Sequence, residues 1–258
     1  MKKNLLFIPA LLFFTLTCFV ALNSGAQGIG LVPDLVTIVP RHVVLKNVQQ
    51  RELIRFSNGV ANIGQGDIRL RPQFPIAGSS GPQLAIQEIL DANRYIVQET
   101  VVSEFDFHAE HNHWHIDDVA LYDIRIGSPD GPVLGINSIK TTFCLIDWYK
   151  LEGNSNTNDR EYWDCNGEYQ GISAGWCDQY HHSLDGQSLD ITGAPAGLYY
   201  LVSTANPEHT FIESNYENNT AWVAFLLTRN NSGNPKIEVI GNSPCSSPAM
   251  CGIGAPNR

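Results

Sequence analysis

Positive charge is scarce in this 258-residue chain. Lysine and arginine together number 16, against 26 aspartates and glutamates, and the formal net charge is −10. A strongly acidic surface repels nucleic acid, so we expect no nucleic-acid partner. The same charge suits a basic substrate such as a lysine side chain, although a solvated acidic surface is the commoner reason for this balance.

Long apolar runs are scarce too, and the one present lies at the N-terminus. Lys2 and Lys3 precede an apolar run from Leu5 to Leu22, and Ser24-Gly25-Ala26 then offers the small residues that a signal peptidase prefers. We therefore predict a signal peptide over residues 1–26, a secreted or periplasmic protein, and no membrane attachment after signal removal. Pro9 and the polar residues that directly follow the apolar run argue against an uncleaved membrane anchor. The short signal and the lack of accessory domains favour a bacterial exported protein.

Long amphipathic helices are hard to find, which argues against a helical fold. Short β-prone runs recur instead between turn residues rich in Gly, Pro and Asn, as in an all-β sandwich. The residues after the signal suffice for one large domain, which we place at 27–227, and residues 228–258 have the composition of a loosely ordered tail. The expected strands are Leu35–Val39, Glu52–Val60, Ile68–Leu70, Tyr95–Val102, His115–Ile126, Leu198–Ser203 and Thr220–Leu227.

Cysteines are few and odd in number after signal removal. Export to an oxidising compartment permits disulfides. Five cysteines cannot all pair within one chain, so at least one is free or pairs elsewhere. The five are Cys144, Cys165, Cys177, Cys245 and Cys251.

Histidine, in contrast, is concentrated. His111, His113 and His115 alternate with other residues, and in a β-strand such positions project to the same face, within reach of one ion. His108 falls on the other parity of such a strand. Neutral imidazole suits copper, zinc, iron or nickel, and three nitrogen ligands leave a coordination position open, so we favour a catalytic metal. A surface histidine cluster or a closed structural site is the alternative.

Several separated motifs between residues 33 and 227 resemble the catalytic domain of lysyl oxidases, copper-dependent amine oxidases with a self-made quinone cofactor. The first motif is His108-Ala-Glu-His111-Asn-His113-Trp-His115, followed by Tyr122-Asp123-Ile124. The second is Lys140-Thr-Thr-Phe143-Cys144-Leu145-Ile-Asp147, and the third runs from Gln170-Gly171 to Asp178-Gln179-Tyr180. Arg55-Phe56-Ser57, Asn62, Asp67 and Arg69 also follow the family pattern, and we assign them to the scaffold.

The resemblance implies a reaction and a set of roles. His111, His113 and His115 would be the copper ligands, and Lys140 and Tyr180 would form lysine tyrosylquinone. A lysyl oxidase deaminates peptidyl-lysine or other primary amines with O2, releasing an aldehyde, ammonia and hydrogen peroxide. In an extended segment, Asp178 would share a face with Tyr180, so Asp178 is our candidate base. A solvated loop carboxylate, an ordinary surface lysine and an ordinary buried tyrosine are the alternatives for these three residues.

The resemblance also implies a calcium site that ties the first strand to the last. Pro33-Asp34-Leu35-Val36 and Glu213-Ser-Asn215-Tyr216-Glu-Asn218-Asn219 match the family's calcium motifs, and calcium prefers such hard oxygens. Asn215 stands where the family has an aspartate, so we expect weaker binding. Asx turns explain Asn-rich bends without any ion. The implied ligands are Asp34, the Leu35 carbonyl, Glu213, Asn215, Asn218 and Asn219.

The cysteines follow the family only in part. Cys144 and Cys165 match a family disulfide, so we expect that bond, whereas Cys177 inherits no partner. Cys245 and Cys251 can form a disulfide within the tail.

Two other functions remain open: a β-sandwich adhesion or matrix module that keeps the metal and calcium sites without turnover, and a zinc hydrolase. The hydrolase would leave Lys140 and Tyr180 unexplained.

Overall fold

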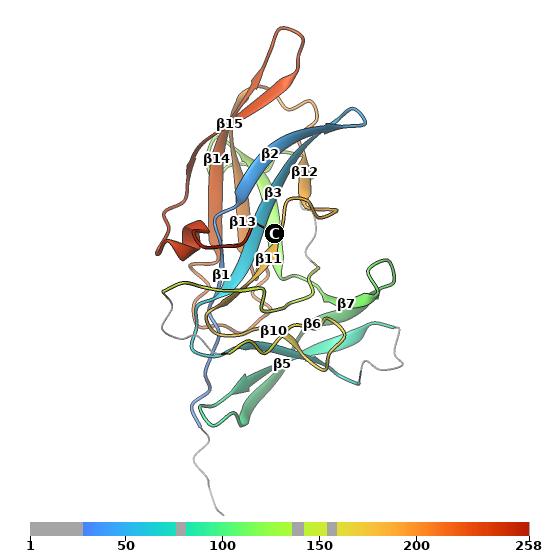
Figure 1. Ribbon diagram of the computed structural model, residues 1–258, viewed down its shortest axis with the longest axis vertical. Coiled ribbons are helices and arrows are strands. Elements are labelled where there is room, and N and C mark those ends of the chain that lie inside the picture. The colour runs from blue at the N-terminus through green and yellow to red at the C-terminus, as the bar shows by residue number, and fades with distance from the viewer. Residues whose placement is uncertain (1–27, 76–80, 136–141, 154–158, 258) are drawn as a thin grey trace, which may run out of the picture.

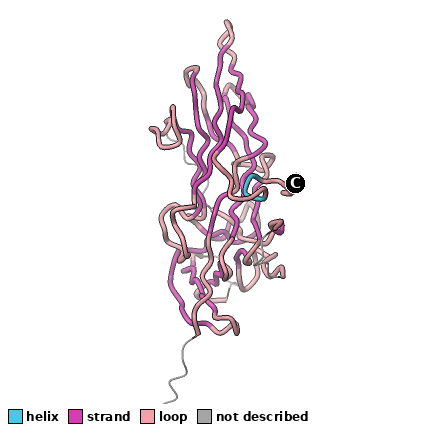
Figure 2. Tube along the Cα trace, turned by 90° about the vertical axis from the view of Figure 1, so that its left-hand side faces the viewer, coloured by secondary structure: helices cyan, strands magenta, loops and turns pink. Residues whose placement is uncertain are grey.

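A computed structural model of the chain describes residues 28–257, apart from 76–80, 136–141 and 154–158. The expected signal peptide and Lys140 lie outside the described residues. Within them the fold is all-β, as predicted, and the only helix is a 3-10 turn at Ala249–Cys251. Figure 1 shows an upper body of long strands with a further sheet below it, and Figure 2 shows the long strands running along the tall axis.

Three sheets make up the structure. The six-stranded sheet has the order β1-β3-β11-β9, with β2 and β12 also paired to β3. The five-stranded sheet has the order β10-β4-β5-β6-β7, and the four-stranded sheet has the order β15-β14-β13-β8. The strands are β1 Leu35–Thr37, β2 Arg41–Val48, β3 Arg51–Asn62, β4 Ile68–Pro72, β5 Gln83–Leu90, β6 Ile96–His108, β7 His113–Ile116, β8 Ala120–Ile126, β9 Tyr149–Lys150, β10 Gln170–Ile172, β11 Trp176–Tyr180, β12 Ser188–Asp190, β13 Gly197–Ala205, β14 Thr220–Arg229 and β15 Pro235–Asn242.

The six-stranded and four-stranded sheets face each other as a sandwich. Phe56 of β3 and Tyr122 of β8 are both buried and meet edge to face, with ring centroids 5.0 Å apart. The Thr37 hydroxyl lies 2.7 Å from that of Ser203, which donates to Asn58 at 2.9 Å, so these three buried polar side chains are hydrogen-bonded to one another. One continuous apolar core joins residues of all three sheets.

The sequence pattern did not predict every strand and strand end correctly, and the structure shows the physical reasons. In β5 apolar and polar residues do not alternate strictly, because the pairing with β6 shifts at Ala85/Ile86 and again at Ile89/Leu90. The expected single strand His115–Ile126 is two strands, since Asp118 adopts a left-handed φ of 61° between them.

The expectation of a loosely ordered tail is wrong for residues 235–242. They form β15, which pairs along β14 and so gains a ladder of backbone hydrogen bonds that composition does not reveal. The Cys245–Cys251 disulfide is present, as the sequence allowed. The proposed domain limits at 27 and 227 stay a prediction.

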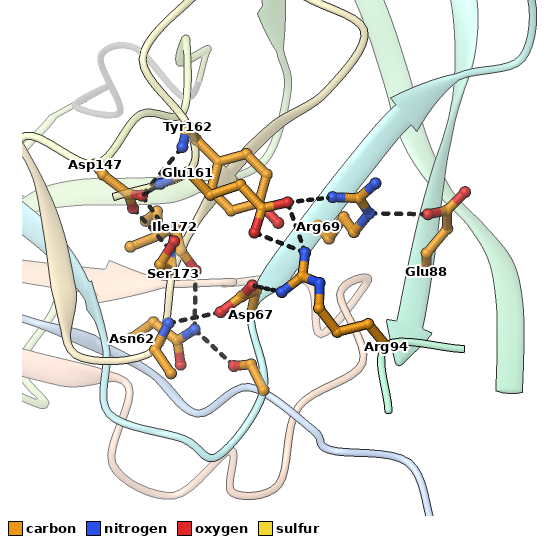
Figure 3. A network of polar contacts seen from close by, with 12 residues as sticks. Asn62, Asp67, Arg69, Glu88, Arg94, Asp147, Glu161, Tyr162, Ile172 and Ser173 are labelled. Carbon is orange, nitrogen blue, oxygen red and sulfur yellow. Dashed lines mark hydrogen bonds and ion pairs between the residues drawn. The ribbon is translucent and has the colours of Figure 1, made fainter. Parts of the chain in front are cut away.

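Below the sandwich, buried polar side chains anchor the loop that connects β9 to β10. Asp147 is fully buried and accepts hydrogen bonds from the backbone N–H groups of Glu161, Tyr162 and Ser173, and from the Ser173 hydroxyl (Figure 3). Asp67 accepts from the Ala174 N–H at 2.8 Å. This network fixes the segment that leads into β11.

The matched scaffold residues take part in the same network. Asn62 donates to the carbonyl oxygens of Gly66 and Ile172, both at 2.9 Å. Arg69 is paired with Glu88 at 3.0 Å and with Glu161 at 2.7 Å. The interpretation of these positions as scaffold therefore agrees with their contacts.

Replacing Asp147 by asparagine is expected to lower the free energy of unfolding by about 2–4 kcal/mol, because an amide offers one acceptor where the carboxylate uses two. Urea unfolding measures the change. Asp185→Asn, at an exposed position, is the control and should change stability by less than about 0.5 kcal/mol. Equal destabilisation by the two variants would contradict the anchoring role.

Candidate active site

The histidine motif forms a β-hairpin and not one strand. β6 ends at His108, a turn covers 109–112, and β7 begins at His113. The turn closes with the His111 N–H donating to the His108 carbonyl at 3.0 Å, and Asn112 adopts a φ of 56°, which asparagine tolerates well. The expectation that His111 shares a strand with His113 and His115 is therefore wrong.

The hairpin also overturns the parity argument about His108. His108 is paired across the hairpin with His113, and cross-strand partners present their side chains to the same face. The chain reversal thus adds a fourth imidazole to the expected three. A parity rule cannot anticipate this, because it assumes that the strand continues.

All four imidazoles gather at this hairpin. The Nε2 atoms of His113 and His115 are 2.8 Å apart, and His108, His111 and His115 offer ring nitrogens within 4.8 Å of one another. The ring centroids of His108 and His115 are 4.1 Å apart, and those of His111 and His115 are 5.2 Å apart. His115 is buried and His111 is exposed, so the cluster has a buried end and a solvent-facing end.

This donor set fits a transition metal. Imidazole nitrogens suit copper and zinc, and an N–N approach of 2.8 Å requires at least one of the two nitrogens to be unprotonated, which is the form that binds a metal. The structure thus brings the three expected ligands together. Their role as copper ligands stays a prediction.

Tyr180 and Asp178 lie on β11, which is extended and so meets the condition for the two side chains to share a face. β11 pairs with β3 in the register Asp178↔Val60 and Tyr180↔Asn58, so the two side chains share a face. Asp178 is only 3 % exposed. The Tyr180 hydroxyl accepts a hydrogen bond from the Cys144 N–H at 3.0 Å, and its ring meets that of Phe143 edge to face at 4.5 Å.

The charge of Asp178 acts on two phenols, the buried Tyr122 and the partly buried Tyr180. Burial, followed by the negative charge of Asp178, raises the pKa of Tyr180 well above its usual value. Burial is also the main cause that raises the pKa of Tyr122, and the negative charge of Asp178 adds to it. Both tyrosines are therefore neutral phenols at physiological pH, and the Asp178 carboxylate lies close enough to influence each of them.

A short backbone bridge connects the histidine hairpin to Tyr180. Ile116, which follows His115, exchanges two backbone hydrogen bonds with Phe143, at 2.7 and 2.8 Å. The Phe143 ring then packs on Tyr180. Lys140, the other expected half of the quinone, lies outside the described residues, three positions before Phe143 in the sequence.

The expected Cys144–Cys165 disulfide and a buried glutamine hold this junction. The disulfide is formed. Gln170 donates to the carbonyl oxygens of Trp114 and Cys165, at 2.9 and 3.1 Å, and accepts from the Leu145 N–H at 3.1 Å. Sequence reasoning gave Gln170 no role, and its place at the start of the third motif was the only sign of one.

Cys177 is a free, buried thiol, in keeping with its lack of an inherited partner. Burial raises its pKa, and its Sγ donates to the Asp178 carbonyl oxygen at 3.3 Å. A protonated thiol in such surroundings is unreactive, so Cys177 has a packing role.

The residues of the expected calcium site also meet. The Glu213 carboxylate accepts from the Leu35 N–H at 2.7 Å and from the Asn219 side chain at 2.8 Å, and Asn218 donates to Asp34 at 2.9 Å. Among the described residues, the side-chain oxygens of Asn218 and Asn219 are buried without a hydrogen-bond partner. Burial raises the pKa of both Glu213 and Asp34, which is the cost that a bound cation would relieve.

Asn215 fits this calcium site less well. Its side-chain oxygen accepts from the Glu217 N–H at 3.0 Å, which is an Asx turn. The turn explanation therefore accounts for Asn215 but not for the two unpaired oxygens of Asn218 and Asn219. Calcium binding stays a prediction.

Calcium is expected to raise the unfolding temperature of the wild-type protein and to have no effect on Glu213→Gln. At a calcium concentration 100 times the dissociation constant, the gain in stability is about 2.7 kcal/mol. Thermal unfolding with calcium and with a chelator measures it, and Glu217→Gln, at an exposed position, should keep the response. A wild-type protein indifferent to calcium would support the Asx-turn explanation.

The fold and site define a class: an all-β domain in which a short backbone bridge connects a histidine hairpin to a partly buried tyrosine. The chain belongs to the lysyl oxidase family, since that family's model matches residues 90–232, more than half of the chain. Lysyl oxidase homolog 3B of Danio rerio is 32% identical over 170 residues, which cover 66% of this chain and 17% of that protein.

Human lysyl oxidase homolog 3 is 31% identical over 66% of this chain and 18% of that protein. Protein-lysine 6-oxidase of Sus scrofa is 31% identical over 45% of this chain and 44% of that protein. The chain therefore spans less than half the length of these relatives. They are vertebrate proteins, so the expected bacterial origin gains no support. Within the described ranges, no helix combines the length and the apolar character needed to cross a membrane.

Proposed function

We propose that this protein is an exported copper amine oxidase that deaminates primary amines, including lysine side chains of peptides. One water and one O2 are consumed for each amine, and an aldehyde, ammonia and hydrogen peroxide are released. The observation that carries the proposal is the backbone bridge between Ile116 and Phe143, which joins the histidine hairpin to the segment packed on Tyr180.

In this proposal His111, His113 and His115 hold copper, and Tyr180 and Lys140 supply the lysine tyrosylquinone. The quinone would accept two electrons from the amine carbon and pass them to O2. Phe143 and the Cys144 N–H hold the Tyr180 ring and its oxygen in place. His108, whose ring lies against His115 and whose ring nitrogen is within 4.8 Å of those of His111 and His115, is a neighbour of the metal with an open role.

Asp178 is the proposed base that removes the proton from the substrate carbon. Its burial and its position on the same face as Tyr180 support this role, since a base must lie within reach of the proton it removes. The acidic net charge of the chain supports a cationic amine substrate, because it attracts such molecules to the surface.

Peptide mapping by mass spectrometry, after maturation with copper and O2, tests the proposal. We expect a covalently linked pair of peptides, one with Lys140 and one with Tyr180, at the mass of the quinone. Two separate, unmodified peptides in fully copper-loaded protein would overturn the oxidase proposal and favour a metal-binding adhesion or matrix module.

A further inference from the structure

A second group of histidines lies away from the hairpin. Of the eight histidines in the chain, four are in the hairpin and His209 is separate. The remaining three, His42, His181 and His182, offer ring nitrogens that all lie within 4.8 Å of one another. His42 belongs to β2, and the other two directly follow β11, so this group borders the six-stranded sheet, whereas the hairpin belongs to the five-stranded sheet.

The backbone of β2 contains a β-bulge at His42. Pairing with β3 passes from Arg41↔Ser57 to Val44↔Arg55, which is a bulge of one extra residue. His42 sits in that bulge with a φ of 51°, a left-handed conformation that is uncommon for a residue other than glycine. Bulges redirect side chains, and this one directs the His42 ring to within 5.6 Å of the His181 ring and 5.4 Å of the His182 ring.

Serine hydroxyls orient the rings. Ser57 is buried, and its oxygen lies 3.0 Å from His42 Nδ1 and accepts a hydrogen bond from the backbone N–H of His182 at 2.9 Å. His181 Nδ1 lies 2.8 Å from the Ser183 hydroxyl and accepts a hydrogen bond from the Ser183 backbone N–H at 3.3 Å, which leaves Nδ1 unprotonated. A histidine that binds a metal commonly donates its other ring N–H to such an oxygen, and the contact with Ser57 would in this way direct Nε2 of His42 to the ion.

The surroundings also favour the metal-binding form of the His42 and His182 rings. Burial, helped by the positive charge of Arg41, lowers the pKa of His42, and burial lowers that of His182. Neutral imidazoles are ligands, whereas protonated ones are not. The positive charges of Arg55 and Lys46 near His182 oppose a cation, so affinity should be lower than at the hairpin.

We propose that His42, His181 and His182 form a second metal site, which binds one divalent transition-metal ion of the zinc or copper type. Ligands about 2.1 Å from an ion are at most about 4.2 Å apart, so binding draws the three partly exposed rings slightly inward. A water completes the coordination. The site is independent of the proposed oxidase activity, although His181 is the residue directly after Tyr180.

Zinc binding to the full-length protein in excess calcium tests the site, by equilibrium dialysis and elemental analysis. Wild-type protein should hold two zinc ions per chain and the double variant His42→Ala/His182→Ala one. His209→Ala, which removes an exposed histidine outside both groups, should hold two. The triple variant His111→Ala/His113→Ala/His115→Ala should keep the second site and hold one ion.

A measurement on unmutated protein guards against a variant that fails to fold. Zinc should protect His181 and His182 from modification by diethyl pyrocarbonate, detected by peptide mapping, while His209 remains reactive. One zinc ion per wild-type chain, or equal modification of His181 and His182 with and without zinc, would overturn the proposal.

Discussion

Copper affinity is expected to fall at least about 100-fold when His113 and His115 are both replaced by alanine, and amine oxidase activity should fall with it. The Nε2 atoms of these residues are 2.8 Å apart, and His115 is buried, so the double variant removes the two nitrogens that converge most closely. A competition titration with a copper chelator measures affinity, and hydrogen peroxide release from a primary amine measures activity.

Matched variants separate a ligand from a neighbour. His209→Ala should leave copper affinity unchanged, because His209 is exposed and outside the hairpin. His108→Ala should weaken binding by about tenfold, since its ring packs on His115 at a centroid distance of 4.1 Å and supports that ligand. Equal copper loss in His108→Ala and His115→Ala would instead make His108 a ligand. Unchanged copper affinity in the double variant would remove the metal centre from the hairpin.

Tyr180→Phe is expected to abolish amine oxidase activity, a loss of about 1,000-fold or more, while leaving the fold intact. The phenol oxygen is indispensable for a tyrosine-derived quinone, whereas the ring that packs on Phe143 is retained. The lost hydrogen bond from the Cys144 N–H should cost about 0.5–1.5 kcal/mol of stability. Activity, the Lys140-linked peptide and urea unfolding are the three readouts.

Tyr199→Phe is the matched control. The Tyr199 hydroxyl also makes one backbone hydrogen bond, to the Pro195 carbonyl at 2.8 Å, but Tyr199 lies in β13 and outside the site. This variant should lose similar stability and keep its activity. A Tyr180→Phe protein with wild-type turnover would show that the reaction does not depend on a Tyr180 quinone.

Some features could be predicted because they depend on local chemistry. β-prone runs between turn residues predicted β13 and β14, and motif order singled out the Cys144–Cys165 pair, which is disulfide-bonded. In each case the deciding interactions lie within a few residues, or follow from the family's order of motifs.

Sequence alone determined which residue types are available for chemistry, namely a dense histidine motif, a tyrosine with a neighbouring aspartate, and an odd number of cysteines. Tertiary structure alone decided which of them meet. The turn at Asn112 brought His108 to the face of His113, and the bulge in β2 brought His42 to residues almost 140 positions later. A sequence pattern describes spacing along one strand, whereas chain reversals, bulges and sheet pairing set the distances between strands.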